Sequence, residues 1–146
     1  MAPLVTVVIV SWNGKVLLSK CLDTFYHNTT DVDCRVVVVD NASTDGSVEM
    51  LKEAYPDVHV IQNIENTGFS IANNQGIRYA LSMGSKYVLL LNNDVEITEP
   101  NWLQELLSVF KSDNQVGVVG CKLLYPNGRL QHAGGVVTLQ VPYNRG

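Results

Sequence analysis

Short runs of β-branched and apolar residues alternate along the chain with segments of helical period, and this alternation constrains the fold more than any other feature. The runs are Val5–Val10, Val36–Val39, Val58–Ile61, Tyr87–Leu91 and Val116–Val119. Runs of this kind are typical of strands that are covered on both faces. Strands that alternate with helices predict an α/β fold: a doubly wound, mostly parallel sheet with right-handed crossovers and helices on both faces.

The segments between the runs carry apolar residues at helical spacing. One face of the first helix is predicted to hold Val16, Leu17, Cys21, Leu22 and Phe25. The third helix, roughly Ser70 to Met83, is predicted to turn inward Ile77, Ala80 and Leu81. The fourth is predicted to share one face among Trp102, Leu103, Leu106, Leu107 and Phe110.

Helix boundaries are marked by residues that start or stop helices. Pro56 is expected to stop the second helix, Gly84 to cap the third at its C-terminus, and Pro100 to lie in the first turn of the fourth. The candidate N-caps of the second helix are Ser43, Thr44 and Asp45.

A C-terminal β-hairpin is predicted after Cys121. Its strands are read at Leu123–Tyr125 and Arg129–Gln131, and Asn127-Gly128 suits the positive φ of a tight turn. A strand-like run, Val136–Val141, follows, and no helix closes the chain, so we expect a truncated domain.

Composition fits one globular domain spanning residues 1–146, since the chain is 46% hydrophobic and 16% charged. Three widely spaced cysteines encode neither a disulfide framework nor a metal site, so a reducing, cytoplasmic location is expected. The net charge of −4, without a cluster of Lys and Arg, argues against nucleic acid as a partner. No apolar run approaches the roughly 20 residues that cross a bilayer, which leaves peripheral contact with the inner face of the membrane open.

Polar residues follow the first four apolar runs, where ligands bind in open α/β sheets. The segments are Ser11–Gly14, Asp40–Ser43, Gln62–Phe69 and Asn92–Asp94. Asp40, as an acceptor, suits the N3–H of uracil or thymine, which cytosine lacks. The alternative for Asp40 is a turn or a helix N-cap, which Asp-Asn-x-Ser also favours.

The other polar segments have similar pairs of interpretations. Asn92–Asp94 could hold Mg²⁺ together with substrate phosphates, or form a solvated turn. Gly68 could admit an anion at the start of the third helix, or only begin that helix. Trp12 could stack on a base or pack at a strand end, and His132 is more often structural than functional.

Missing motifs leave a classical dinucleotide-binding fold, a P-loop NTPase and a nucleophile elbow without support. The chain has no GxGxxG after its first strand, no GxxxxGK[ST] and no GxSxG. A receiver-type signalling domain needs acidic residues where this chain has Ser11-Trp12-Asn13.

Five ordered motifs together resemble family 2 glycosyltransferases, and among them the rhamnosyltransferase-like enzymes of bacterial cell-surface polysaccharide synthesis. The motifs span Val7–Gly14, Val37–Ser47, Asn66–Phe69, Leu90–Asp94 and Gln131–Gly135. The resemblance implies a GT-A fold, a nucleotide-sugar donor, a divalent metal (Mg²⁺ or Mn²⁺) and inversion at the anomeric carbon.

Site residues follow from the same resemblance. It implies that Asp40 binds the pyrimidine of a UDP- or dTDP-sugar, in a pocket lined by the backbone of Val10 and Ser11 and by the ring of Trp12. Asn92, Asn93 and Asp94 take the place of the family's DxD motif, with Asn93 facing the ribose or donor sugar and Asp94 binding the metal. The donor site is further lined by Asn66, Gly68 and Asn73.

The resemblance also suggests what the chain lacks. The family's general base is expected beyond Gly146, in the half of the domain that binds the glycan or lipid-linked acceptor. We therefore expect the chain to bind the donor and to transfer sugar poorly by itself. The alternative is a non-catalytic nucleotide-binding or assembly module, and an exposed sheet edge leaves homodimerisation open.

Overall fold

The computed structural model describes residues 4–134, in which strands and helices alternate as predicted. The elements are β1 (Val5–Ser11), α1 (Lys15–Asn28), β2 (Cys34–Asp40), α2 (Ser47–Ala54), β3 (His59–Gln62), α3 (Phe69–Ser82), β4 (Tyr87–Asn92), α4 (Trp102–Ser112), β5 (Leu123–Leu124) and β6 (Leu130–His132). The backbone divides into two compact units, the first ending at Trp102 and the second beginning at Leu103. No helix among the described residues is long and apolar enough to cross a membrane.

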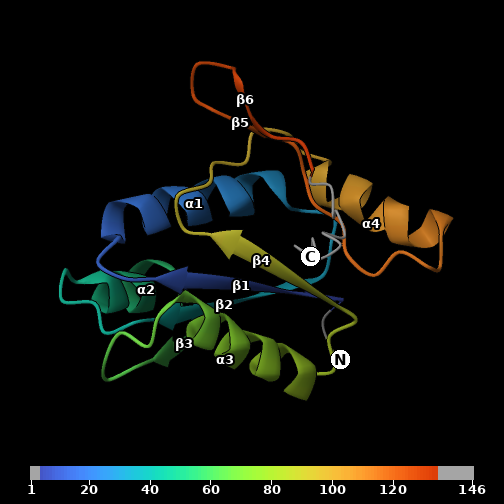
Figure 1. The fold of residues 1–146 in the computed structure, drawn as a ribbon. Helices are drawn as coiled ribbons and strands as arrows, with labels where there is room; N and C mark the ends of the chain where they lie inside the picture. Colours follow the sequence, from blue (N-terminus) through green and yellow to red (C-terminus); the bar gives the residue numbers. More distant parts are fainter. Residues whose placement is uncertain (1–3, 135–146) are drawn as a thin grey trace, which may run out of the picture. The chain divides into compact units, whose positions relative to one another are not determined.

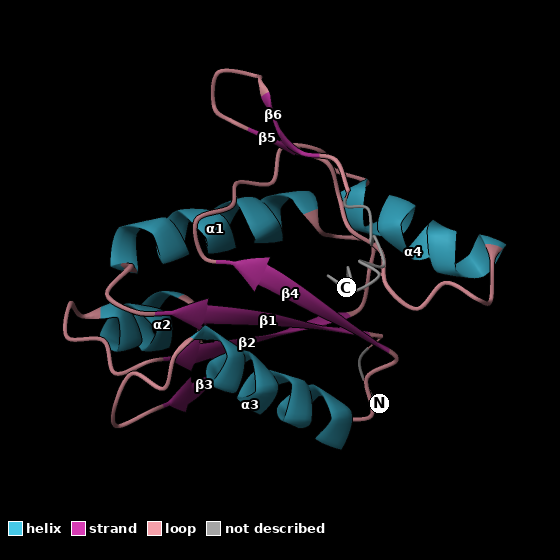
Figure 2. Cartoon of the chain, viewed as in Figure 1, coloured by secondary structure: helices cyan, strands magenta, loops and turns pink. Residues whose placement is uncertain are grey.

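The first unit holds a four-stranded sheet in the order β3-β2-β1-β4, with every pair of strands parallel. Figure 2 shows the four arrows pointing the same way. Right-handed crossovers place α1 and α2 on one face and α3 on the other, as Figure 1 shows. The chain winds outward from β1 to β3 and then returns to the far side of β1, so the sheet has a topological switch point between β1 and β4. The predicted doubly wound α/β fold is confirmed.

The core lies along β1 and β2. Their buried apolar side chains include Val7, Val8, Ile9, Val36, Val37, Val38 and Val39. β4 forms an edge of the described sheet and is less covered than predicted, since Leu90 remains 50% exposed. An edge strand has one neighbouring strand instead of two, so an apolar run does not by itself secure burial.

The helix faces differ in part from those predicted. In α1 the buried residues are Leu18, Cys21, Leu22 and Phe25, whereas Val16 is 79% exposed and Leu17 is also exposed. The spacing i, i+3, i+4, i+7 from Leu18 defines the buried stripe, and the two preceding residues fall outside it. In α3 Ala80 is buried as predicted, but Ile77 is only half-buried and Leu81 is exposed. The buried face of α3 is made of Ala72, Asn73, Gly76 and Ala80.

The helix ends agree only in part with the predicted markers. The predicted N-caps of α2, Ser43, Thr44 and Asp45, are wrong, because Gly46 takes that position with a φ of 82°. Pro56 comes directly after the C-cap of α2, and Gly84 has a φ of 73°. The N–H of Gly84 donates to the carbonyl of Leu81, and that of Ser85 donates to the carbonyl of Ala80, which completes a Schellman cap. Pro100 lies in a turn two residues before α4, so it precedes the helix and is not part of its first turn.

The second unit contains the predicted hairpin but not the predicted fifth parallel strand. β5 and β6 pair antiparallel, and Gly128 in their turn has a φ of 79°. Residues 116–119 form no strand, and Val118 is 90% exposed. β-branched residues favour extended backbone but do not provide a pairing partner, and these residues have none among those described. The strand predicted over residues 136–141 lies outside the described residues.

Candidate functional site

The polar segments that follow the four parallel strands lie at one end of the sheet, as predicted (Figure 1). Strand register aligns them, because Ser11 pairs with Asp40 and Val10 pairs with Asn92. Val10, Ser11, Asp40 and Asn92 therefore meet at the carboxyl ends of β1, β2 and β4. This edge includes the switch point, where an open α/β sheet forms its ligand crevice.

Asp40 is fully buried at the end of β2, and its two carboxylate oxygens differ. Oδ2 accepts a hydrogen bond from the backbone N–H of Ser43 over 3.0 Å, which is the turn that the sequence offers as an alternative role. Oδ1 is buried and has no hydrogen-bond partner among the described residues. Buried acceptors are seldom left unpaired, so Oδ1 is an unsatisfied acceptor at this edge of the sheet.

Trp12 lies one residue beyond the end of β1, with its side chain 57% exposed. The carbonyl of Ser11 accepts a hydrogen bond from the backbone N–H of Asn41 over 2.8 Å, so β1 and β2 stay paired up to this point. Neighbouring strands are about 4.8 Å apart. The backbone thus brings the exposed ring of Trp12 and the buried carboxylate of Asp40 to adjacent strand ends.

The loops that follow β1 and β2 are joined by side-chain hydrogen bonds. The backbone N–H of Asn13 donates to Oγ of Ser43 over 2.9 Å, and Oδ1 of Asn13 accepts from the backbone N–H of Thr44 over 2.8 Å. Oδ2 of Asp45 accepts from the backbone N–H of Lys15 over 2.9 Å. We call these five residues, Asn13, Lys15, Ser43, Thr44 and Asp45, the loop clasp.

Asp45 in the loop clasp also contacts the first residue of α2, Ser47. Its Oδ1 accepts from the backbone N–H of Ser47 over 3.1 Å and from the hydroxyl of the same residue, while Gly46 takes the N-cap position with a φ of 82°. Slight burial raises the pKa of Asp45. Hydrogen bonds from Ser47 and Lys15 lower the pKa by more than burial raises it. The net pKa lies below its usual value, so Asp45 is held as a carboxylate between the first turns of α1 and α2.

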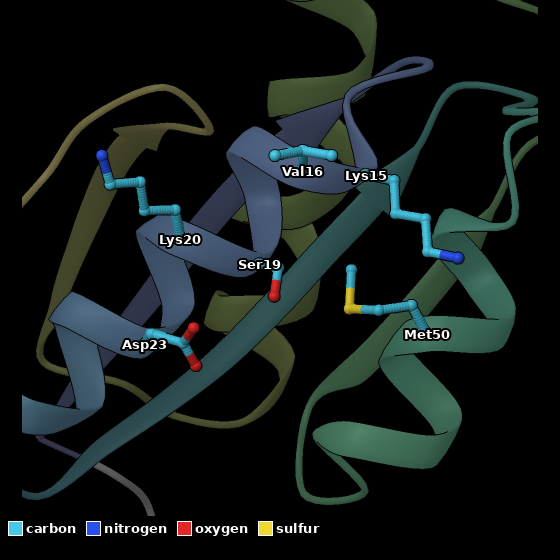
Figure 3. A pocket seen from close by; sticks show the side chains of 6 residues that line it. All are labelled: Lys15, Val16, Ser19, Lys20, Asp23 and Met50. Atoms are coloured by element: carbon cyan, nitrogen blue, oxygen red, sulfur yellow. The ribbon is translucent and has the colours of Figure 1, made fainter.

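A hollow of about 360 Å³ lies between α1 and α2 and is shown in Figure 3. It is lined by Lys15, Val16, Ser19, Lys20, Asp23 and Met50. None of these residues is a predicted site residue. In Figure 3 the side chain of Lys15 extends from α1 toward α2, and its Nζ would lie 3.2 Å from a Cβ at Gly46.

Asn93 is the first residue after β4 and reaches back to β1. Its Nδ2 donates to Oγ of Ser11 over 3.1 Å. Asp94, the next residue, is exposed, as is Asn92. Residues 4–134 contain no group of three or more His, Cys, Asp and Glu side chains that could hold a metal. The chain therefore offers one exposed carboxylate at this place, which suits a metal whose other ligands come from a bound phosphate or water.

The segment after β4 is fixed along one side of α1. The backbone N–H of Ile97 donates to Oγ1 of Thr24 over 3.1 Å, and the carbonyl of Ile97 accepts from Nδ2 of Asn28 over 2.8 Å. Nearer β4, the thiol of Cys21 donates to the carbonyl of Asn92 over 3.5 Å. Burial is the main cause that raises the pKa of that thiol to about 11; a backbone hydrogen bond with Val95 lowers the pKa, and the charge of Asp94 raises it. Cys21 therefore remains a neutral donor.

The loop before α3 is held by a network of amides. Asn63 and Gln75 exchange two hydrogen bonds of 2.9 Å, and Oδ1 of Asn41 accepts from Asn63 and from Thr67. Nδ2 of Asn41 donates to the carbonyl of Gly68 over 3.3 Å. The network connects the ends of β2 and β3 to α3, and so fixes the residue that begins α3.

The three site residues predicted in this segment are placed as follows. Gly68 is the N-cap of α3 with a φ of 80°, and a Cβ there would meet nothing within 4 Å. Oδ1 of Asn66 accepts from the backbone N–H of Gly68 over 2.9 Å. Asn73 is buried, and its Nδ2 donates to the carbonyl of Phe69 in the same helix. The donor-binding roles of these residues stay predictions.

Sequence reasoning did not assign functions to Asn13, Asn41, Asn63, Thr67 and Gln75. Four of these follow a strand end directly or within a few residues, so their position in the sequence could have marked them as site candidates. Gln75 lies on α3, and its pairing with Asn63 required the fold. His132, in β6 of the second unit, is exposed.

Together, the parallel sheet, its switch point and the strand-end polar residues define an α/β domain with a ligand-binding edge. The family model "Glycosyl transferase family 2" matches residues 6–133. The chain therefore belongs to glycosyltransferase family 2.

Two curated relatives illustrate the family. The chain is 34% identical over 137 residues to the O-antigen biosynthesis protein RfbC of Myxococcus xanthus, covering 92% of this chain and 10% of that protein. It is 32% identical over 130 residues to the poly(ribitol-phosphate) beta-glucosyltransferase of Bacillus spizizenii, covering 86% of this chain and 20% of that protein. The chain thus spans a fifth or less of these two relatives.

Two solved structures have the same fold. One is the mannosyltransferase PcManGT from Pyrobaculum calidifontis in complex with GDP-Man and Mn²⁺, with a TM-score of 0.69, 28% identity, and coverage of 87% of this chain and 37% of that chain. The other is S. aureus TarS 1-349 in complex with UDP-GlcNAc, with a TM-score of 0.63 and 18% identity over 85% of this chain and 41% of that chain. The second supports the GT-A fold alone.

Proposed function

We propose that the chain is the donor-binding portion of an inverting glycosyltransferase that uses a UDP- or dTDP-sugar. The observation that carries this proposal is the buried Asp40, whose Oδ1 has no hydrogen-bond partner among the described residues. It lies at the end of β2, next to the switch point where α/β sheets bind ligands. The acceptor in this proposal is a glycan or a lipid-linked glycan of cell-surface polysaccharide synthesis.

Asp40 would select the base by hydrogen bonding. Its unpaired oxygen can accept the N3–H of uracil or thymine, whereas cytosine has no proton on N3 at neutral pH. The ring of Trp12, at the adjacent strand end, would stack on the base. Guanine also carries an N–H donor, and PcManGT is described with GDP-Man, so GDP is the natural competitor to test.

Asp94 would hold Mg²⁺ or Mn²⁺, and Asn93 would face the ribose or the donor sugar. A bound divalent metal supplies positive charge that stabilises the departing diphosphate. Asp94 is a single exposed carboxylate, so we expect metal affinity to be low without nucleotide, because phosphate oxygens are needed as further ligands. Asn66, Gly68 and Asn73 would line the remainder of the donor site.

The rest of the enzyme is proposed from the relatives, of which this chain spans only part. The general base that deprotonates the acceptor hydroxyl is not assigned to any described residue. The transferred sugar in this proposal is a hexose or a rhamnose. The proposed location is the cytoplasm, at the inner face of the cell membrane, and a homodimer is compatible with it.

Calorimetric titration of the chain tests the proposal. UDP, dTDP, GDP and CDP are compared, each with and without Mn²⁺, on the native chain and on Asp40→Asn and Asp94→Asn. We expect UDP or dTDP to bind more tightly than CDP, Asp40→Asn to remove this preference, and Asp94→Asn to remove the effect of Mn²⁺. If the native chain binds all four nucleotides with equal affinity, and Asp40→Asn does the same, the proposed base site is refuted.

A further inference from the structure

Both loops of the loop clasp contain a residue in a left-handed conformation. Asn13 has a φ of 49° and Ala42 has a φ of 64°, and they are the two non-glycine residues with positive φ among residues 4–134. Left-handed backbone is unfavourable for most non-glycine residues, and surrounding contacts maintain it. Asn13 belongs to the loop clasp, and Ala42 directly precedes its Ser43.

The loop clasp supplies these contacts from both directions. The main chain of Asn13 donates to Ser43, and its side chain accepts from Thr44. The carboxylate of Asp45 accepts from Lys15, two residues beyond Asn13. Each loop therefore uses its own side chains to satisfy backbone N–H groups of the other.

The two residues proposed to bind the base lie immediately before these bonds. Trp12 precedes Asn13, and Asp40 directly precedes the segment that contains Ala42 and Ser43. Asp40 takes part as well, since its Oδ2 fixes the backbone N–H of Ser43. Displacement of Ser43 or Asn13 would therefore shift the exposed ring of Trp12 relative to the unpaired Oδ1 of Asp40.

We infer that Asn13 and Asp45 are positioning residues for nucleobase selection: they hold the loop after β1 against the loop after β2 and so set the ring of Trp12 relative to Asp40. Neither side chain needs to touch the base. The inference rests on the proposed function, because it assigns the base to Trp12 and Asp40. It adds that selectivity among bases depends on contacts between the two loops.

Two variants weaken the loop clasp in different loops. Asn13→Gly removes the side-chain acceptor and tolerates the positive φ, and Asp45→Ala removes the carboxylate. The matched controls are Asn127→Gly and Asp113→Ala, because Asn127 and Asp113 also accept a backbone N–H but lie in the second unit. All four full-length chains are compared with the native chain by thermal unfolding, so that any unfolded fraction is known.

Titration with UDP and CDP measures selectivity. We expect both loop-clasp variants to bind UDP about tenfold more weakly, the effect of roughly 1.4 kcal/mol, while the two controls bind like the native chain. The ratio of the CDP and UDP dissociation constants should fall at least about threefold, which a change in folded fraction alone would not cause. Unchanged affinity and ratio in both variants would overturn the inference and leave the proposed function standing.

Nuclear magnetic relaxation of the Trp12 indole N–H, measured without nucleotide, tests the positioning role separately from the proposed nucleotide binding. We expect a lower order parameter for this group in Asn13→Gly and Asp45→Ala than in the native chain and the controls. If the native chain binds no nucleotide, the proposed function fails and selection by these residues fails with it; the indole relaxation then decides only whether they hold Trp12. Unchanged indole relaxation in both variants would overturn the positioning role even if UDP binds.

Discussion

Nδ2 of Asn93 donates a hydrogen bond to Oγ of Ser11 over 3.1 Å, which joins the ends of β4 and β1 across the switch point of the sheet. Gly14 lies against this contact, because a Cβ built on it would be 2.6 Å from Nδ2 of Asn93 and 3.4 Å from Oγ of Ser11. The absence of a side chain at position 14 therefore sets where Asn93 lies. Because Asp94 follows Asn93, it also sets where the proposed metal ligand begins.

Gly14→Ala should displace Asn93 and weaken donor binding. The added methyl group cannot remain 2.6 Å from an amide nitrogen, so the Asn93 side chain must move away from Ser11. We expect UDP with Mn²⁺ to bind about tenfold more weakly, and the free energy of unfolding to fall by about 1 kcal/mol or more. Calorimetry and urea unfolding measure the two effects. Gly117→Ala is the control, since a Cβ there meets nothing within 4 Å; equal UDP affinity in both variants would contradict the prediction.

The strand-end positions of Ser11, Asp40 and Asn93 could be predicted because they depend on one regularity: parallel strands bring their carboxyl ends to one edge. Apolar residues at helical spacing likewise predicted the helices, and Pro56 and Gly84 marked two of their ends. What could not be predicted was which strand lies at an edge, because this depends on pairing across the chain and not on local pattern. Leu90 and residues 116–119 were misjudged for that reason.

Side-chain partners distant in sequence were equally hidden. Asn13 and Thr44 are 31 residues apart, and Asn28 and Ile97 are 69 residues apart, so no local spacing connects them. The two roles of Asp40 show the same limit. Its sequence context indicated either a turn or a base contact, whereas in the fold Oδ2 forms the turn and Oδ1 remains unpaired.

Gly76→Ala should destabilise the fold although alanine favours helices by roughly 1 kcal/mol. A Cβ at Gly76 would lie 2.2 Å from Cγ1 of Val8, so α3 would have to move away from β1. We expect the free energy of unfolding to fall by about 2 kcal/mol or more in urea. The double variant with Val8→Ala should recover part of the loss. Strictly additive effects would contradict direct packing between the two residues.

Thr24→Val should loosen the segment after β4 at its contact with α1. Valine keeps the shape of the side chain but leaves the backbone N–H of Ile97 without its acceptor. We expect the free energy of unfolding to fall by about 1–2 kcal/mol and the Mn²⁺-dependent part of UDP binding to weaken, because the same segment carries Asp94. The control is Thr30→Val, which removes a hydroxyl that bonds the neighbouring Asp31. If Thr24→Val behaves like Thr30→Val, Thr24 does not position this segment.

Acid should open the loop clasp only below the ordinary titration range of a carboxyl group. Slight burial raises the pKa of Asp45, but hydrogen bonds from Ser47 and Lys15 bring it below 3.8. A carboxyl group whose pKa is lower in the folded than in the unfolded state contributes stability above the unfolded pKa and loses it as pH falls through the folded pKa. The stability difference between the native chain and Asp45→Asn should therefore be largest above pH 3.8 and shrink below it. The ¹³C shift of the Asp45 carboxyl group gives the midpoint directly, and a midpoint at or above 3.8 would show that these hydrogen bonds do not favour the ionised form.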